Sequence, residues 1–221
     1  MTKSKIKQVE NYAKKIMKEE VAHDFKHVDR VRNWALRIAK EEGYHDIEIV
    51  EVTALLHDVG LPYVEERRMH GAIGAEMATK FLRERGFFEE ETIEEIANAI
   101  RYHCSLEDRG GKLPDILRDA DSMDALGAVG IMRAFTSKSS KPEYEPGNVR
   151  GDTWGVSSRG FDERLDSKME VGDYIIDQIN FQISLYDDLS TETARRLAKP
   201  LVEFMKDYVI QLQREIEGGG K

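Results

Sequence analysis

The sequence predicts an all-α protein, and three observations lead to this prediction. Apolar residues recur at intervals of three and four along most of the chain, which is the period of one helix face. No segment shows the convincing alternation of apolar and polar residues that a half-buried strand requires. Histidines and aspartates fall at the ends or on the inner faces of the expected helices. We therefore expect a helical bundle in a single domain over residues 1–217, with a flexible tail at 218–221.

The overall composition limits the classes of function. The chain has 221 residues, a formal net charge of −9 and 40% hydrophobic residues, which is typical of a soluble globular protein. A negative chain is poorly suited to long nucleic acid, whose binding depends on many phosphate contacts. No apolar run is long enough to span a membrane, and the charged start is unlike a secretion signal. The single cysteine, Cys104, excludes an internal disulfide and fits a reducing cytoplasm, where we expect the protein to act.

In the first half of the chain, helices are expected where capping residues meet apolar stripes. Residues 3–20 have the pattern of an amphipathic helix. Asp24 and Asp46 are suitable N-caps for the two helices that follow. Gly86 is a suitable end for the next helix, and residues 90–103 have a clear helical stripe. The predicted N-caps set the faces that the second and third helices bury.

The second half of the chain is expected to contain long helices and one long irregular segment. Helices are predicted over 116–134, over 165–189 and over 191–217, with Ser190 as the cap of the last one. The predicted inner stripe of the last helix consists of Leu197, Leu201, Phe204, Tyr208, Leu212 and Ile216. Residues 136–160 have no helical period. Such a segment is usually a functional lid or a disordered insertion, and both alternatives stay open here.

Residues able to bind a metal occur on the ends and inner stripes of these helices. They are His27, His57, Asp58, His70, His103 and Asp121. Four of the six histidines take such positions, which is more than chance placement would give. The adjacent His57 and Asp58 lie in an apolar run, where a cation would offset the cost of burying them. A histidine that caps the helix end is the alternative for this pair alone. Imidazole and carboxylate ligands suit Mn²⁺, Fe²⁺, Zn²⁺, Ni²⁺ or Co²⁺.

His27, the pair His57-Asp58, and Asp121 resemble the ordered H…HD…D signature of the HD-domain metal-dependent phosphohydrolases. The motif Ala-Asp-Ser-Met-Asp at 120–124 is similar to the last motif of that family. The segments 23–27 and 191–198 look like the small bacterial HD hydrolases, which include nucleotide pyrophosphohydrolases. The resemblance extends over most of residues 21–217. It implies an HD-type helical bundle with one metal held by His27, His57, Asp58 and Asp121.

The resemblance leaves the roles of His70 and His103 open. Both residues fall in the order that two-metal HD proteins use, so a second metal is one alternative. The other is that they donate hydrogen bonds to a phosphate oxygen and to the leaving group. The expected catalytic residues are Asp58, His70, His103 and Asp124. Of these, Asp58 or Asp124 would orient the attacking water or accept its proton.

Three basic residues are candidates for substrate binding. Arg30 follows His27 by one helical turn and can form a fork-shaped contact with a phosphate, although a surface ion pair is an equal alternative. Arg150 lies in the irregular segment, where Trp154 can stack on a base. Lys112 is a further candidate, although the pattern of a phosphate-cradling loop is absent around it.

The expected function is hydrolysis of a phosphate ester or anhydride by a metal-activated water. The expected partner is a small phosphorylated substrate, in particular a nucleotide, whose identity the sequence leaves open. The alternatives are a two-iron oxygenase of the HD type and a nucleotide-sensing module without turnover. One or two divalent ions, and a homodimer as well as a monomer, are compatible with the sequence.

Overall fold

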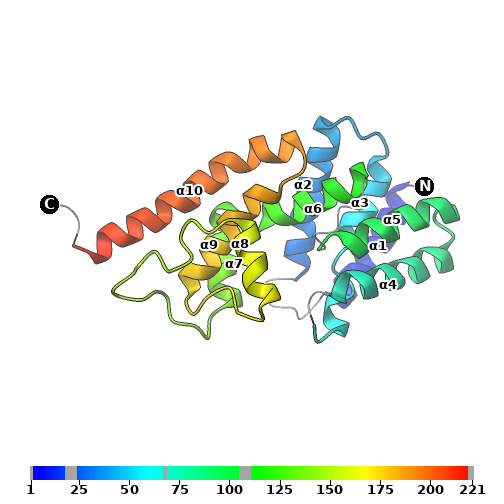
Figure 1. Cartoon of the computed structure of the whole chain (residues 1–221). Helices are drawn as coiled ribbons and strands as arrows, with labels where there is room; N and C mark the ends of the chain where they lie inside the picture. Colours follow the sequence, from blue (N-terminus) through cyan, green and yellow to red (C-terminus); the bar gives the residue numbers. More distant parts are fainter. Residues whose placement is uncertain (1, 18–23, 67–68, 105–110, 219–221) are drawn as a thin grey trace. The chain divides into compact units, whose positions relative to one another are not determined.

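The structure is a computed structural model of the whole chain, and it describes residues 2–17, 24–66, 69–104 and 111–218. Within these ranges the chain forms α-helices and short 3-10 turns without a strand, so the all-α prediction is confirmed (Figure 1). The chain divides into two compact units, Met1–Asp121 and Ser122–Lys221, each of which is described by itself. The expectation of one domain stays a prediction. None of the described helices is long and apolar enough to cross a membrane.

In the first unit, other helices surround the buried helix α3. This unit contains α1 (Thr2–Ile16), α2 (Phe25–Glu41), α3 (Ile47–Leu56), the 3-10 turn η1 (Leu61–Tyr63), α4 (His70–Arg85), α5 (Glu90–Tyr102) and most of α6 (Lys112–Asp124). Helix α3 packs against α1, α2 and α5, and α4 lies along α5 (Figure 1). Because α3 is surrounded in this way, polar groups at its end are removed from water. The end of the predicted helix over 3–20 lies partly outside the described residues.

Capping residues fix where these helices begin and end. The Asp24 carboxylate accepts hydrogen bonds from the first N–H groups of α2, including that of His27 at 3.2 Å. The Asp46 carboxylate caps α3 in the same way. Both predicted N-caps are therefore confirmed, and so is Gly86, whose φ of 60° ends α4. The caps set the register of α2 and α3, and thereby the directions in which His27 and His57 point.

The second unit contains the end of α6, α7 (Gly127–Ser137), α8 (Ser158–Asp166), α9 (Ile175–Ser184), the 3-10 turn η3 (Leu185–Asp188) and α10 (Glu192–Ile216). Helices α7, α9 and α10 pack against one another. The irregular segment between α7 and α8 is tied to α9, because the N–H of Ile175 donates to the carbonyl of Pro142 at 2.9 Å. This segment is shorter than predicted, since α8 begins within 136–160.

The single helices predicted over 116–134 and over 165–189 are both wrong, because the backbone turns within each range. Gly127 separates α6 from α7 and has a φ of 67°. Lys168 lies between α8 and α9 and has a φ of 58°. Both values belong to the left-handed region, which a right-handed helix cannot continue through. The apolar period persists across the first turn because Leu126 and Ile131 are both buried, whereas Leu165 and Met169 beside the second turn are exposed. The period alone therefore did not reveal the breaks.

Helix α10 buries a different face from the one predicted. Its buried apolar residues are Ala194, Ala198, Val202, Met205 and Val209. Of the predicted stripe, Phe204 is 49% exposed and Ile216 is 36% exposed. The cap is Thr191 rather than Ser190, and its hydroxyl accepts a hydrogen bond from the N–H of Ala194 at 3.1 Å. Both sets repeat at intervals of three and four, but the buried set lies one position further along the chain, which rotates the buried face by about 100°.

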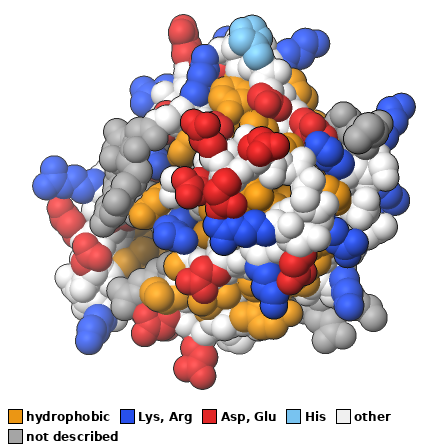
Figure 2. Space-filling view, turned by 90° about the vertical axis from the view of Figure 1, so that its right-hand side faces the viewer, with side chains coloured by type: hydrophobic (Ala, Val, Ile, Leu, Met, Phe, Trp, Pro, Cys, Tyr) orange, Lys and Arg blue, Asp and Glu red, His pale blue; other side chains and the backbone are white. Residues whose placement is uncertain are grey.

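Acidic and basic side chains are interspersed on the molecular face shown in Figure 2. Apolar side chains lie between them in the same view. In a protein that binds long nucleic acid, the basic residues are usually clustered on one face or along one groove. The face in Figure 2 does not show basic residues gathered in this way.

Candidate metal centre

Two histidines and two aspartates converge in the first unit. His27 and His57 are fully buried, and their Nε2 atoms lie 3.3 Å apart. Asp58 Oδ2 lies 3.4 Å from the Nε2 of His27 and 3.5 Å from that of His57. Asp121 Oδ1 lies 3.4 Å and 4.0 Å from the same two nitrogen atoms. One nitrogen or oxygen atom from each of these residues therefore faces a common point.

The orientation of His57 follows from its place at the end of α3. Its Nδ1 donates a hydrogen bond to the carbonyl of Ala54 at 2.8 Å, which assigns the ring proton to Nδ1. The lone pair of Nε2 is then directed at the other three residues. Burial lowers the pKa of His57 to about 4, so the ring is neutral at neutral pH. Neutral imidazole is the form that binds a metal.

Asp121 is the most accessible member of the group, with a side chain that is 32% exposed. Burial by itself raises the pKa of this carboxyl, but His27 and His57 lower it by a larger amount together. The pKa of Asp121 therefore lies below its ordinary value. This residue is an ionised oxygen donor at neutral pH.

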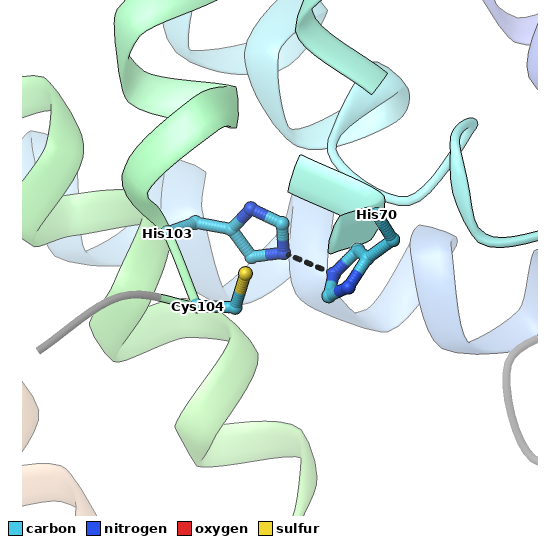
Figure 3. A group of neighbouring side chains, drawn as sticks. All are labelled: His70, His103 and Cys104. Atoms are coloured by element: carbon cyan, nitrogen blue, oxygen red, sulfur yellow. Dashed lines mark hydrogen bonds between the residues drawn. The ribbon is translucent and has the colours of Figure 1, made fainter. Parts of the chain in front are cut away.

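A second group of side chains faces the other oxygen of Asp58. The Oδ1 atom lies 3.2 Å from the Nε2 of His70 and 3.7 Å from the Nε2 of His103. These two nitrogen atoms are 3.0 Å apart (Figure 3). The Nδ1 of His103 donates to the carbonyl of Ile100 at 2.6 Å, which repeats the arrangement at the end of α3. The Sγ of Cys104 and the two histidine nitrogens all lie within 4.8 Å of one another.

Close contacts between backbones bring the two groups together. A Cβ added to Gly60 would lie 2.3 Å from the carbonyl oxygen of His70. A Cβ added to Gly71 would lie 2.7 Å from the carbonyl oxygen of Arg101. Both distances are shorter than any ordinary carbon–oxygen contact, so a side chain at either glycine would force the first turn of α4 away from its neighbours. This fit places His70 beside the ends of α3 and α5.

Other residues predicted for the site have different contacts. Asp124 is buried, and its Oδ2 forms an ion pair with Arg133 Nη1 at 2.7 Å. The amine of Lys112 donates to the backbone carbonyl of Glu42. Arg30 is half-buried on α2. The catalytic and substrate-binding roles expected for these residues stay predictions.

The segment 136–160 was expected to cover the site, and two of its residues, Arg150 and Trp154, have contacts within the second unit. The Nε of Arg150 donates to the side-chain oxygen of Gln213, and its guanidinium lies 5.5 Å from the ring centre of Trp154. The lid function of this segment stays a prediction. Sequence reasoning assigned no role to Cys104 in the site, although its position directly after His103 was a usable signal.

Comparison with known proteins shows what the chain is similar to. Residues 24–128 match the model of the HD domain. The chain is 28% identical over 230 residues to YpgQ, an uncharacterised protein of Bacillus subtilis, with 96% of this chain and 93% of YpgQ covered. The crystal structure of YpgQ in complex with ADP is 26% identical, has a TM-score of 0.66, and covers 99% of this chain and 98% of that one.

A structure from an uncultured Thermotogales bacterium, described as a predicted HD superfamily hydrolase, is also similar. It is 26% identical, has a TM-score of 0.61, and covers 96% of this chain and 91% of that one. Residues 24–128 therefore match an HD domain, and the resemblance to the HD-domain superfamily inferred from the ordered His and Asp residues is confirmed. HD domains bind divalent metals, and His27, His57 and Asp121 form a group that can hold one.

Proposed function

We propose that this protein is a metal-dependent phosphohydrolase that cleaves a phosphate ester or anhydride of a nucleotide. The main support for this proposal is that the side chains of His27, His57, Asp58 and Asp121 converge on one point. Their facing atoms are separated by 3.3 to 4.0 Å. Metal–ligand bonds of about 2.1 Å place neighbouring ligands roughly 3.0 to 3.5 Å apart. A small movement is therefore enough for these four residues to surround one cation.

The chemistry of these four residues fits a divalent cation. The proton on Nδ1 of His57 leaves its Nε2 as an acceptor, and this acceptor faces a carboxylate oxygen of Asp58 at 3.5 Å. The same Nε2 lies 3.3 Å from the Nε2 of His27, and a cation at this point would bind the lone pairs of these atoms together. The burial of both residues thus supports a cation at this point.

When bound, a divalent cation lowers the pKa of a coordinated water toward neutrality and withdraws charge from a phosphoryl group. The side chains around it have separate tasks. Asp58 can orient the attacking water and accept its proton. Donation from the Nε2 of His70, and from that of His103 when its ring is protonated at both nitrogens, can stabilise phosphoryl oxygens or the leaving group. The alternative for these two histidines is a second cation on the Oδ1 side of Asp58.

Two observations support a nucleotide as the substrate. The similar protein YpgQ has a crystal structure in complex with ADP. In this chain, Arg30 follows His27 by one turn on α2, and its guanidinium can form paired hydrogen bonds with a phosphate. Because the net charge is −9, a cation and a few basic side chains must provide the attraction for an anionic substrate locally.

One observation favours a second candidate function. The Asp58 carboxylate lies between two groups of histidines, which is the arrangement that a pair of irons would need. A two-iron oxygenase is therefore the alternative activity. To test this alternative, the protein is loaded anaerobically with Fe²⁺ and then exposed to oxygen while spectroscopy follows the iron. Oxygen consumption and oxidation of an added substrate are measured together, because only an oxygenase couples them.

A metal-dependent activity screen tests the phosphohydrolase. The chelator-treated protein is assayed with nucleoside mono-, di- and triphosphates and with cyclic nucleotides, in the presence of Mn²⁺, Co²⁺, Ni²⁺, Zn²⁺ or Mg²⁺. We expect Asp121→Ala to reduce turnover at least about 100-fold, because a ligand of the cation is lost. Asp115→Ala, which removes another carboxylate from α6, should leave turnover within a small factor of the parent. Equal turnover of the parent and Asp121→Ala would contradict the proposal.

A further inference from the structure

We propose that a cavity in the second unit binds a small organic cation that also carries one carboxylate, the class to which amino acids with basic side chains belong. The cavity has a volume of about 280 Å³. Sites for small molecules have volumes of roughly 300 to 1,000 Å³, so this cavity fits a ligand at the small end of that range. Its walls come from the irregular segment after α7, from α8, and from the residues that start α9. None of the residues of the candidate metal centre lines it.

The wall of this cavity is acidic. Four carboxyl groups and one guanidinium line it, so four negative charges and one positive charge give a formal net charge of −3. Carboxylates that share one cavity repel one another unless a cation lies among them. An occupant with a net positive charge would therefore stabilise this wall. The charged lining residues are Glu145, Asp152, Asp173, Asp177 and Arg164.

Hydrogen bonds from the same unit hold three of these carboxylates in place. Each accepts a hydrogen bond of 2.6 Å from one side chain. The pairs are Tyr174 with Glu145, Asn148 with Asp152, and Thr153 with Asp177. A carboxylate has about four lone-pair positions, so each can accept further hydrogen bonds from a ligand. Asp173 is exposed, and it makes no hydrogen bond or ion pair with the described residues. The wall is thus fixed in position and can still bind donors.

Arg164 lines the same cavity and has no acceptor among the described residues. Its Nε is buried without a hydrogen bond, and its guanidinium forms no ion pair with a described carboxylate. A buried donor without an acceptor costs free energy. A carboxylate of the ligand would supply the acceptor, because arginine forms two parallel hydrogen bonds with such a group. A phosphate fits less well, since its second negative charge would face the carboxylates of the wall.

An organic cation fits this wall better than a metal ion. Among the described residues, the groups of three or more metal-binding side chains with ligand atoms within 4.8 Å of one another all belong to the first unit. No three carboxylates of the cavity are therefore close enough to surround one ion. A molecule with two positively charged ends can instead reach separate carboxylates while its own carboxylate meets Arg164. Arginine and lysine have this pattern.

Isothermal titration calorimetry of the full chain with matched compounds tests the proposal. Agmatine is arginine without its carboxylate, and L-citrulline is arginine without its side-chain charge. L-Lysine and cadaverine, its decarboxylated form, make a second pair. We expect L-arginine, L-lysine or both to bind at least about tenfold more tightly than these control compounds, because each control lacks one set of charge-assisted hydrogen bonds. The comparison uses the parent protein, so it does not depend on the folding of a variant.

Substitution of Arg164 assigns the carboxylate of the ligand to its place in the wall. Arg164→Gln should weaken binding of the amino acid at least about tenfold, because the ligand carboxylate loses its partner. The same change should leave the affinity for agmatine unchanged or higher, since a like charge is removed. The matched control is Arg159→Gln, which changes an exposed arginine of the same helix and should bind as the parent does. Circular dichroism of each variant checks that the helices are retained.

Three results would overturn the proposal. The first is that neither amino acid binds to the parent at concentrations up to about 10 mM. The second is that each amino acid binds no more tightly than its decarboxylated form, which would indicate a site for amines alone. The third is that a folded Arg164→Gln binds the amino acid as tightly as Arg159→Gln does.

Discussion

Each unit of this protein buries a cluster of polar side chains, and the two clusters are stabilised in opposite ways. In the second unit, Asp177 accepts hydrogen bonds from the Thr153 hydroxyl at 2.6 Å and from the N–H of Tyr174 at 3.1 Å. The amide nitrogen of Asn180 donates to the carbonyl of Arg150 at 2.8 Å. Each of these donors meets an acceptor from the chain itself, and the result is a fixed path for the irregular segment along α9.

In the first unit, nitrogen and oxygen atoms from four residues are directed at one point. The Nε2 of His57 and the Oδ2 of Asp58 are both acceptors, and they lie 3.5 Å apart in a buried place. The comparison teaches how to interpret buried polar residues. Paired donors and acceptors indicate a structural role, whereas acceptors directed at one point indicate a bound cation.

The largest expected effect comes from breaking the first cluster. His27→Ala should lower phosphohydrolase turnover at least about 100-fold, because it removes a nitrogen from the group around the cation. The matched control is His45→Ala, which changes an exposed histidine in the turn before α3. Steady-state assays with excess metal measure both. If the two variants lose activity equally, the buried position of His27 has no special role.

A second effect, on stability, is expected from acid on the metal-free protein. The pKa of His57 is about 4 in the folded state and near 6.5 when the chain is unfolded. Between these values the unfolded chain binds more protons, so the contribution of this residue to stability is complete above about pH 6.5 and is lost as the pH falls toward 4. The shift corresponds to about 3 kcal/mol.

Chemical denaturation of the chelator-treated protein at several pH values measures this dependence. The comparison variant is His57→Gln, which lacks the titrating group and should show a flatter profile over the same range. Identical profiles for the parent and His57→Gln would show that burial of His57 does not resist its protonation.

The smallest of these effects is expected in the second cluster. Thr153→Val removes the hydroxyl that donates to Asp177 and should lower the free energy of unfolding by about 1–3 kcal/mol. Metal content should be unchanged, since Thr153 takes no part in the first cluster. Urea denaturation and elemental analysis together check this. A loss of metal from Thr153→Val would undermine the distinction between the two clusters.

The sequence allowed good predictions where local chemistry determines structure. Asp24 and Asp46 cap helices through contacts within three residues, so the faces of α2 and α3 follow from the sequence itself. The order of His27, the pair His57-Asp58, and Asp121 in the sequence predicted that these side chains lie close together. The distances between them show that they do. Their role as ligands of a metal stays a prediction.

Features that depend on packing between helices were not predictable. The place of Cys104 beside His70 results from the close contact of Gly71 with the end of α5, which no local pattern reveals. The ion pair of Asp124 with Arg133 crosses the break between α6 and α7, which the predicted continuous helix concealed.

The central claim is that the four converging residues hold a divalent cation, and elemental analysis of Asp58→Ala tests it most directly. The parent, Asp58→Ala and Asp207→Ala, which changes an exposed carboxylate of α10, are purified from the same metal-supplemented medium. We expect the parent and Asp207→Ala to carry equal amounts of a transition metal and Asp58→Ala to carry little or none, because its carboxylate faces both histidine groups. Equal metal content in all three proteins would contradict the claim.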